Sequence, residues 1–102
     1  MYKVGIRSSF QARHFLPGIA GPESSPHEHT YALQWVCATE TLDENGFSID
    51  ISLLEELLRQ GVEAVRGRLL NDLPFFRERQ PSVENMAGYF HASLLDALAG
   101  RG

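Results

Sequence analysis

Two stretches of alternating apolar and polar residues constrain the fold of this chain more than any other feature of its sequence. The first runs from Tyr2 to His14, and the second from His27 to about Thr39. Successive side chains of a β-strand point to opposite faces, so each stretch predicts a long, half-buried strand. Residues 17–26 hold three prolines and two glycines, which predicts a loop between the two strands.

Three histidines share the apolar parity of these strands. His14 ends the apolar face of the first strand, and His27 and His29 begin that of the second. Strands adjacent in sequence usually pair, and antiparallel pairing would bring the three imidazoles together on one face. We expect a zinc site, because imidazole nitrogen suits zinc and a catalytic site needs three protein ligands plus an open position. The competing interpretation is a set of polar side chains at a strand entrance.

Two helices are expected after the strands. Leucines and valines at helical spacing predict the first over residues 51–68, with Ser52 and Glu55 as a capping box. The Asn45-Gly46 turn precedes it, and Phe47 with Ile49 predicts a short extended segment.

The second helix is predicted to follow the connection 69–81. Ser82 is its expected cap, and Glu84 in its first turn complements the helix dipole. The buried stripe of this helix comprises Val83, Met86, Ala87, Phe90, Leu94 and Leu98.

Composition limits the classes of function. With 102 residues the chain is expected to form one domain, and its net charge of -4 argues against nucleic acid as the main partner. No apolar run reaches the length of a membrane span, and the strand-like start is unlike a secretory signal. The single cysteine, Cys37, favours a reducing, cytoplasmic setting; we expect it to be a small core residue and His91 to be solvated.

Five motifs in order resemble the 6-pyruvoyl-tetrahydropterin synthase and 6-carboxy-tetrahydropterin synthase family. The resemblance covers nearly the whole chain, and Glu28 takes the place of glycine in the family's His-Gly-His-x-Tyr motif. The matching segments are Ser9-Phe10-Gln11-Ala12-Arg13-His14, His27-Glu28-His29-Thr30-Tyr31, residues 43–50, Leu70-Asn71-Asp72 and Pro81-Ser82-Val83-Glu84-Asn85.

The resemblance implies an α+β tunnelling fold (T-fold), in which an antiparallel sheet carries two helices on one face. It implies assembly into trimers or hexamers, with active sites shared between subunits. It also implies zinc on His14, His27 and His29 and a pterin substrate, with Ser82 and Glu84 helping to shape the pterin pocket.

The chain departs from the family pattern at three places. Glu23 stands where many members carry a cysteine, Arg66-Gly67 replaces the catalytic Asp-His pair, and the family's last two strands have no counterpart after Leu98. From the residues alone, Glu23 is an exposed loop glutamate. A branch of the family with glutamate at this position resembles an aldolase-type enzyme that cleaves the side chain of dihydroneopterin.

We therefore favour a zinc-dependent lyase acting on the side chain of a dihydropterin, with Glu23 as the catalytic acid and base. The alternative is a non-catalytic homologue that binds zinc and a pterin but lacks the family's Cys and Asp-His. A purely structural zinc protein is the third hypothesis; it requires a fourth protein ligand, for which the sequence offers no obvious residue.

Overall fold

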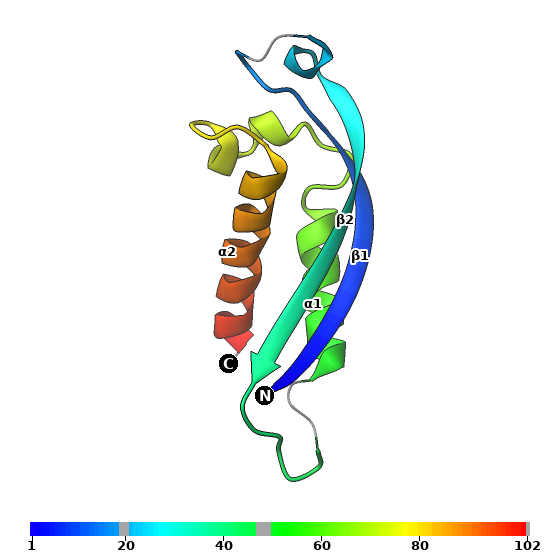
Figure 1. The fold of residues 1–102 in the computed structure, drawn as a ribbon, viewed down its shortest axis with the longest axis vertical. Helices are drawn as coiled ribbons and strands as arrows, with labels where there is room; N and C mark the ends of the chain where they lie inside the picture. Colours follow the sequence, from blue (N-terminus) through cyan, green and yellow to red (C-terminus); the bar gives the residue numbers. More distant parts are fainter. Residues whose placement is uncertain (19–20, 47–49, 102) are drawn as a thin grey trace.

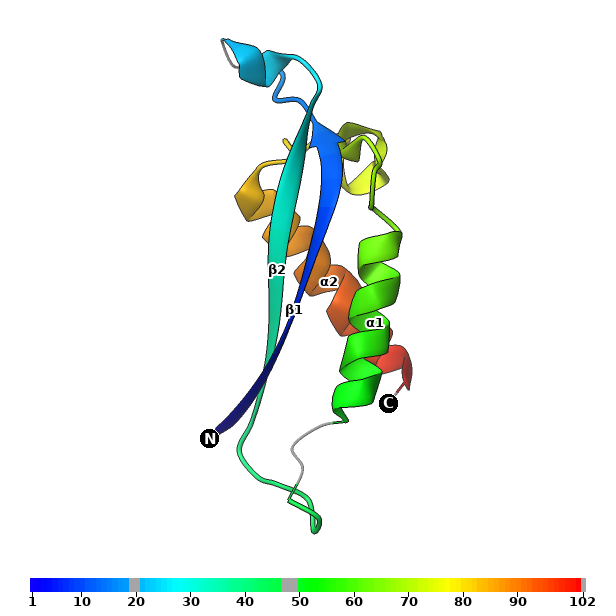
Figure 2. The same ribbon diagram turned by 90° about the vertical axis from the view of Figure 1, so that its right-hand side faces the viewer.

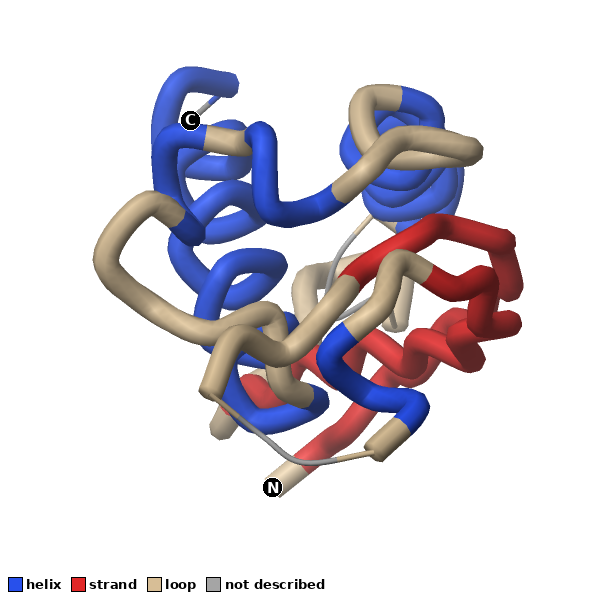
Figure 3. Tube along the Cα trace, turned by 90° about the horizontal axis from the view of Figure 1, so that it is seen from above, coloured by secondary structure: helices blue, strands red, loops and turns tan. Residues whose placement is uncertain are grey.

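A long β-hairpin is the largest element of the computed structural model, which describes residues 1–18, 21–46 and 50–101. Strands β1 (Tyr2–His14) and β2 (His27–Thr39) form the hairpin. Helices α1 (Ile51–Glu63) and α2 (Val83–Arg101) lie on one of its faces (Figure 1, Figure 3). The predicted α+β arrangement of antiparallel strands with two helices on one face is therefore confirmed.

The hairpin is paired in one continuous antiparallel register. Tyr2 lies opposite Thr39 at one end, and His14 lies opposite His27 at the other. Both strands have the predicted bounds. Because side chains alternate between faces, this register directs all three histidines toward the helix-covered side.

The core lies between the helices and the half of the hairpin nearest His14. Figure 2 shows both helices on the same side of the strands. The main cluster of buried residues comprises Phe10, Ala12, Leu58, Val62, Val65, Leu70, Leu73, Phe76, Met86, Phe90 and Leu94. Cys37, expected in the core, is only half-buried near the other end of the hairpin, where burial raises the pKa of its thiol.

Helix α1 ends at Glu63 rather than near residue 68, because the following turn pairs with β1. Gly67 has a φ of 71°, a left-handed conformation that glycine adopts without steric cost. Its N–H donates to Gln11 O at 2.6 Å, and Arg13 N–H donates to Arg68 O at 2.9 Å. These two bonds draw the chain out of the helix and along the outer edge of β1.

The two helices approach each other closely at Gly61. A Cβ built there would lie 3.4 Å from Leu94 Cδ2 and 3.9 Å from Phe90 Cε1. Alanine would make ordinary van der Waals contacts at these distances, whereas a side chain that extends beyond Cβ would meet Leu94 and Phe90.

The sequence predicts the N-terminal cap of α2 but not that of α1. Ser82 Oγ accepts from Asn85 N–H at 3.2 Å, so the predicted cap of α2 is confirmed. For α1 the predicted capping box is wrong, because Asp50 is the cap: its carboxylate accepts from the N–H groups of Ser52 and Leu53. The extended segment expected at Phe47 and Ile49 lies outside the described residues.

Substitution of the observed cap tests this assignment. Asp50→Ala should lower the free energy of unfolding by about 1 kcal/mol, because two helix N–H groups lose their acceptor. Ser52→Ala is the matched control and should change it by less than about 0.5 kcal/mol, as expected for an exposed residue away from a cap. Urea denaturation monitored by circular dichroism measures both; a larger loss for Ser52→Ala would favour the capping box instead.

Candidate metal centre

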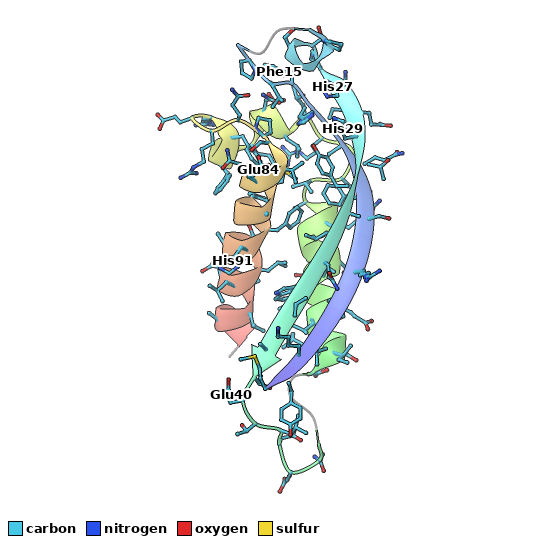
Figure 4. The ribbon with its side chains drawn as sticks, viewed as in Figure 1. Phe15, His27, His29, Glu40, Glu84 and His91 are labelled. Atoms are coloured by element: carbon cyan, nitrogen blue, oxygen red, sulfur yellow. The ribbon has the colours of Figure 1, made fainter. Side chains whose placement is uncertain are left out.

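Three imidazole rings converge where the two strands meet the loop. The Nε2 atoms of His14 and His27 are 3.0 Å apart, and those of His27 and His29 are also 3.0 Å apart. The three residues offer ligand atoms that all lie within 4.8 Å of one another. His14 is buried, with 5% of its surface exposed, whereas His29 is open to solvent. Figure 4 shows His27 and His29 on β2, at the end of the molecule where α2 begins.

Two of the rings have their tautomer fixed by backbone carbonyls. His14 Nδ1 lies 2.8 Å from Pro81 O, and His27 Nδ1 lies 2.8 Å from Ser25 O. A carbonyl oxygen can only accept, so each Nδ1 carries the proton. In a neutral ring the Nε2 atom then has a lone pair and no proton, and these two lone pairs face each other.

This arrangement fits a cation held between the rings. Two facing lone pairs 3.0 Å apart repel unless a positive charge lies between them. Zinc bound at about 2.0–2.1 Å in tetrahedral geometry would separate two nitrogen ligands by about 3.3 Å. The donor set also suits zinc, because metal-binding histidines usually donate their other ring N–H to a carbonyl or carboxylate.

Local sequence explains how β2 presents His27. Ser25 precedes Pro26, and a residue before proline is restricted to extended conformations. Ser25 is extended, with φ −104° and ψ 146°, and its carbonyl receives the His27 Nδ1–H. Glu28, one residue further, lies opposite Arg13 and has the parity of the other face of the sheet.

Tyr31 adds a second contact to His14. Its ring stacks on Phe10 with centroids 5.3 Å apart, and its hydroxyl oxygen lies 3.3 Å from His14 Nδ1. Because that nitrogen carries a proton already directed at Pro81 O, Tyr31 Oη accepts a share of the same proton. Burial raises the pKa of Tyr31, so its phenol remains protonated at neutral pH.

Asn71 holds the chain directly after His14. Its Oδ1 accepts from Phe15 N–H at 3.0 Å, and its Nδ2 donates to Phe15 O at 2.9 Å. The Leu70-Asn71-Asp72 segment thus forms more than a turn: it secures both backbone groups at the end of β1. A strand end that would otherwise fray is fixed next to a candidate ligand.

The other predicted site residues, Glu23, Ser82 and Glu84, lie in the loop before His27 and at the start of α2. Glu23 lies in a one-turn 3-10 helix, Pro22–Ser24, in the loop before His27, and its side chain lies outside the described atoms. Ser82 directly follows Pro81, the residue that contacts His14. Glu84 is exposed in the first turn of α2, at the same end of the molecule as the histidines (Figure 4). His91 is exposed lower on this helix, as expected.

The alternation of the strands predicts the meeting of the three histidines but not the groups that orient them. Strand parity does place Tyr31 on the histidine face. The Pro81 carbonyl and the Asn71 amide come from segments more than fifty residues away from His14, so only the family motifs that contain them could have drawn attention to them.

Comparison with known proteins identifies the family and the fold. The family described as 6-pyruvoyl tetrahydropterin synthase matches residues 3–102. The chain belongs to this family. A solved structure, 6-pyruvoyl tetrahydropterin synthase from Caenorhabditis elegans, superposes with a TM-score of 0.81 at 23% identity, covering 91% of this chain and 76% of that one. The expected T-fold is thereby confirmed. A search of curated proteins gave no match.

Among the residues that the structure describes, no helix has both the length and the apolar character needed to cross a bilayer.

The triad predicts one divalent metal ion per chain. In protein purified without chelator, elemental analysis should find zinc near one equivalent, and His27→Ala should remove most of it, because two ligands bind far more weakly than three. His91→Ala is the control and should retain the metal, since this exposed histidine lies on α2 and not on the strands that carry the three candidate ligands. Equal zinc content in the two variants would contradict the site.

Proposed function

We propose that this chain is a zinc-dependent lyase of pterin metabolism, cleaving the side chain of dihydroneopterin or its triphosphate. The observation that carries the proposal is the pair of Nε2 atoms, on His14 and His27, whose lone pairs are directed at one point by carbonyl-bound Nδ1–H groups. Family membership supplies the substrate class, because the matching family is named for a tetrahydropterin synthase.

The exposed position of His29 favours a catalytic over a structural site. His14 is buried and His29 is open to solvent, so the cluster has one side toward the protein and one side toward incoming molecules. Zinc bound there would act as a Lewis acid that polarises a substrate hydroxyl. A structural site would instead be closed by a fourth protein ligand.

In this proposal Glu23 moves the proton. Its carboxylate takes the proton from the C2′ hydroxyl of the substrate, the C1′–C2′ bond breaks to release glycolaldehyde, and the proton returns to C1′. The product is 6-hydroxymethyl-dihydropterin. Ser82 and Glu84 contact the pterin ring; both lie at the start of α2, next to the Pro81 carbonyl that holds His14.

Incubation with dihydroneopterin tests the activity. We expect formation of 6-hydroxymethyl-dihydropterin, detected by chromatography with fluorescence, and a loss of at least about 100-fold in kcat for Glu23→Gln, as for removal of a general acid–base. Glu44→Gln, in the turn at the other end of the hairpin, is the control and should leave kcat unchanged.

Other outcomes of this assay discriminate between the hypotheses. Binding of the pterin without turnover would replace the lyase with the non-catalytic zinc- and pterin-binding homologue. Turnover that survives Glu23→Gln would reject the role of this residue.

We further propose that the chain acts as a homo-oligomer, a trimer or hexamer, in the cytoplasm. In the described part of the chain the sheet has two strands; the outer edge of β2 is open, whereas the outer edge of β1 is partly covered where Gln11 and Arg13 bond to residues 67–68. Open edges favour pairing with another strand. Beside β2, a hollow of about 340 Å³ is lined by apolar side chains that include Leu33, Trp35, Phe90 and Leu94. A strand from a second copy would cover both features.

A proline on the open edge of β2 tests the assembly. Gln11 and Arg13 bond to residues 67–68 outside the hairpin, so the odd residues of β1 direct their backbone N–H and C=O groups away from β2. Directly opposite residues of an antiparallel pair point their backbone groups either both inward or both outward, so the even residues of β2 direct theirs away from β1. Gln34→Pro therefore removes an outward N–H and leaves the hairpin bonds intact. We expect a smaller mass by light scattering, with Gln34→Thr retaining the oligomer; a monomeric wild type would contradict the proposal.

A further inference from the structure

A buried support of the candidate metal centre comes from the turn before α2. Pro81 is fully buried, and its carbonyl accepts the His14 Nδ1–H at 2.8 Å. A backbone carbonyl can fix a ring only if its own peptide is fixed. The contacts around residues 80–82 therefore decide how firmly His14 is oriented.

Asn85 spans this turn from within the first helical turn of α2. Its side-chain Nδ2 donates to Gln80 O at 2.9 Å, and its backbone N–H donates to Ser82 Oγ at 3.2 Å. The two bonds reach the residues on either side of Pro81. Gln80 is also tied to the loop after β1, because its Nε2 donates to Pro17 O at 3.2 Å.

We propose that Asn85 is a positioning residue for the metal centre. It holds the turn at residues 80–82 so that Pro81 O keeps the proton of His14 on Nδ1, which leaves the Nε2 lone pair directed at His27 and His29. The inference rests on the proposed metal site and adds a residue outside the ligand set and outside the residues assigned to the pterin.

The contacts of His14 Nδ1 show why a shift of the Pro81 carbonyl would matter. Tyr31 Oη also lies 3.3 Å from His14 Nδ1, and this hydroxyl can accept or donate when Pro81 O moves away. A hydroxyl that donates to Nδ1 stabilises the opposite tautomer, with the proton on Nε2. That tautomer cannot bind a metal through Nε2 without losing a proton.

Asn85→Ala separates this role from a structural one. In metal-free protein, long-range ¹⁵N–¹H correlation spectra of the histidine rings should show His14 protonated on Nδ1 in the wild type, and a growing Nε2–H population in the variant. Zinc affinity, measured by competition with a chromophoric chelator, should fall about 10-fold, as for other groups that orient metal ligands.

Two further variants serve as a control and as an alternative to Asn85→Ala. Gln60→Ala removes a comparable amide bond, from Gln60 Nε2 to Glu56 Oε1 on α1, and should change neither the tautomer nor the affinity. Asn85→Asp keeps the size of the side chain but replaces the Nδ2 donor with a carboxylate oxygen, which cannot donate to Gln80 O. If Asn85→Ala fails to fold, the His14 tautomer and the zinc affinity of Asn85→Asp decide the question.

The outcomes distinguish this inference from the proposed function. A wild-type His14 tautomer and wild-type zinc affinity in the Asn85 variants would overturn the positioning role while leaving the metal site intact. A wild-type protein that binds no zinc would overturn the proposed function; the tautomer comparison in metal-free protein would still decide what Asn85 does.

Discussion

The antiparallel register of the hairpin is the constraint on which the rest of the structure depends. Because His14 lies opposite His27, three imidazoles separated by up to fifteen positions in sequence meet at one point. A slip of one residue would turn every side chain of one strand to the other face. The same slip would expose Phe10 and Ala12, so the packing of the core and the convergence of the three histidines require the same register.

Much of this arrangement is readable from the sequence because it depends on a period of two. Alternation gives the strands, their faces and the meeting of the histidines, and a search for serine caps finds the start of α2. The end of α1 was not predictable in the same way: apolar spacing continues to Leu69, but pairing of Gly67 and Arg68 with β1 overrides it. The Asp50 cap was missed because Ser52 and Glu55 offered a rival pattern two residues later.

The supports of His14 could not be derived from periodicity, because they are backbone groups and amides brought from distant segments. Asn71 secures Phe15, and Pro81 O secures the imidazole itself. Both belong to segments by which the sequence resembles its family, and the structure gives each a physical role: each fixes one side of the strand end that carries His14. A histidine at the frayed end of a strand would otherwise occupy several rotamers.

Fixing these rings has an energetic consequence for the fold. The carbonyls of Pro81 and Ser25 direct two Nε2 lone pairs at each other across 3.0 Å, an arrangement that a cation between the rings would stabilise. A ligand that binds only the folded state stabilises it by about 2.7 kcal/mol at a free concentration 100 times its Kd. Small domains have a total stability of about 5–15 kcal/mol, so the metal would be a substantial part of it. In the proposed zinc enzyme, the orientation of these rings would thus also couple the stability of the hairpin end to metal binding.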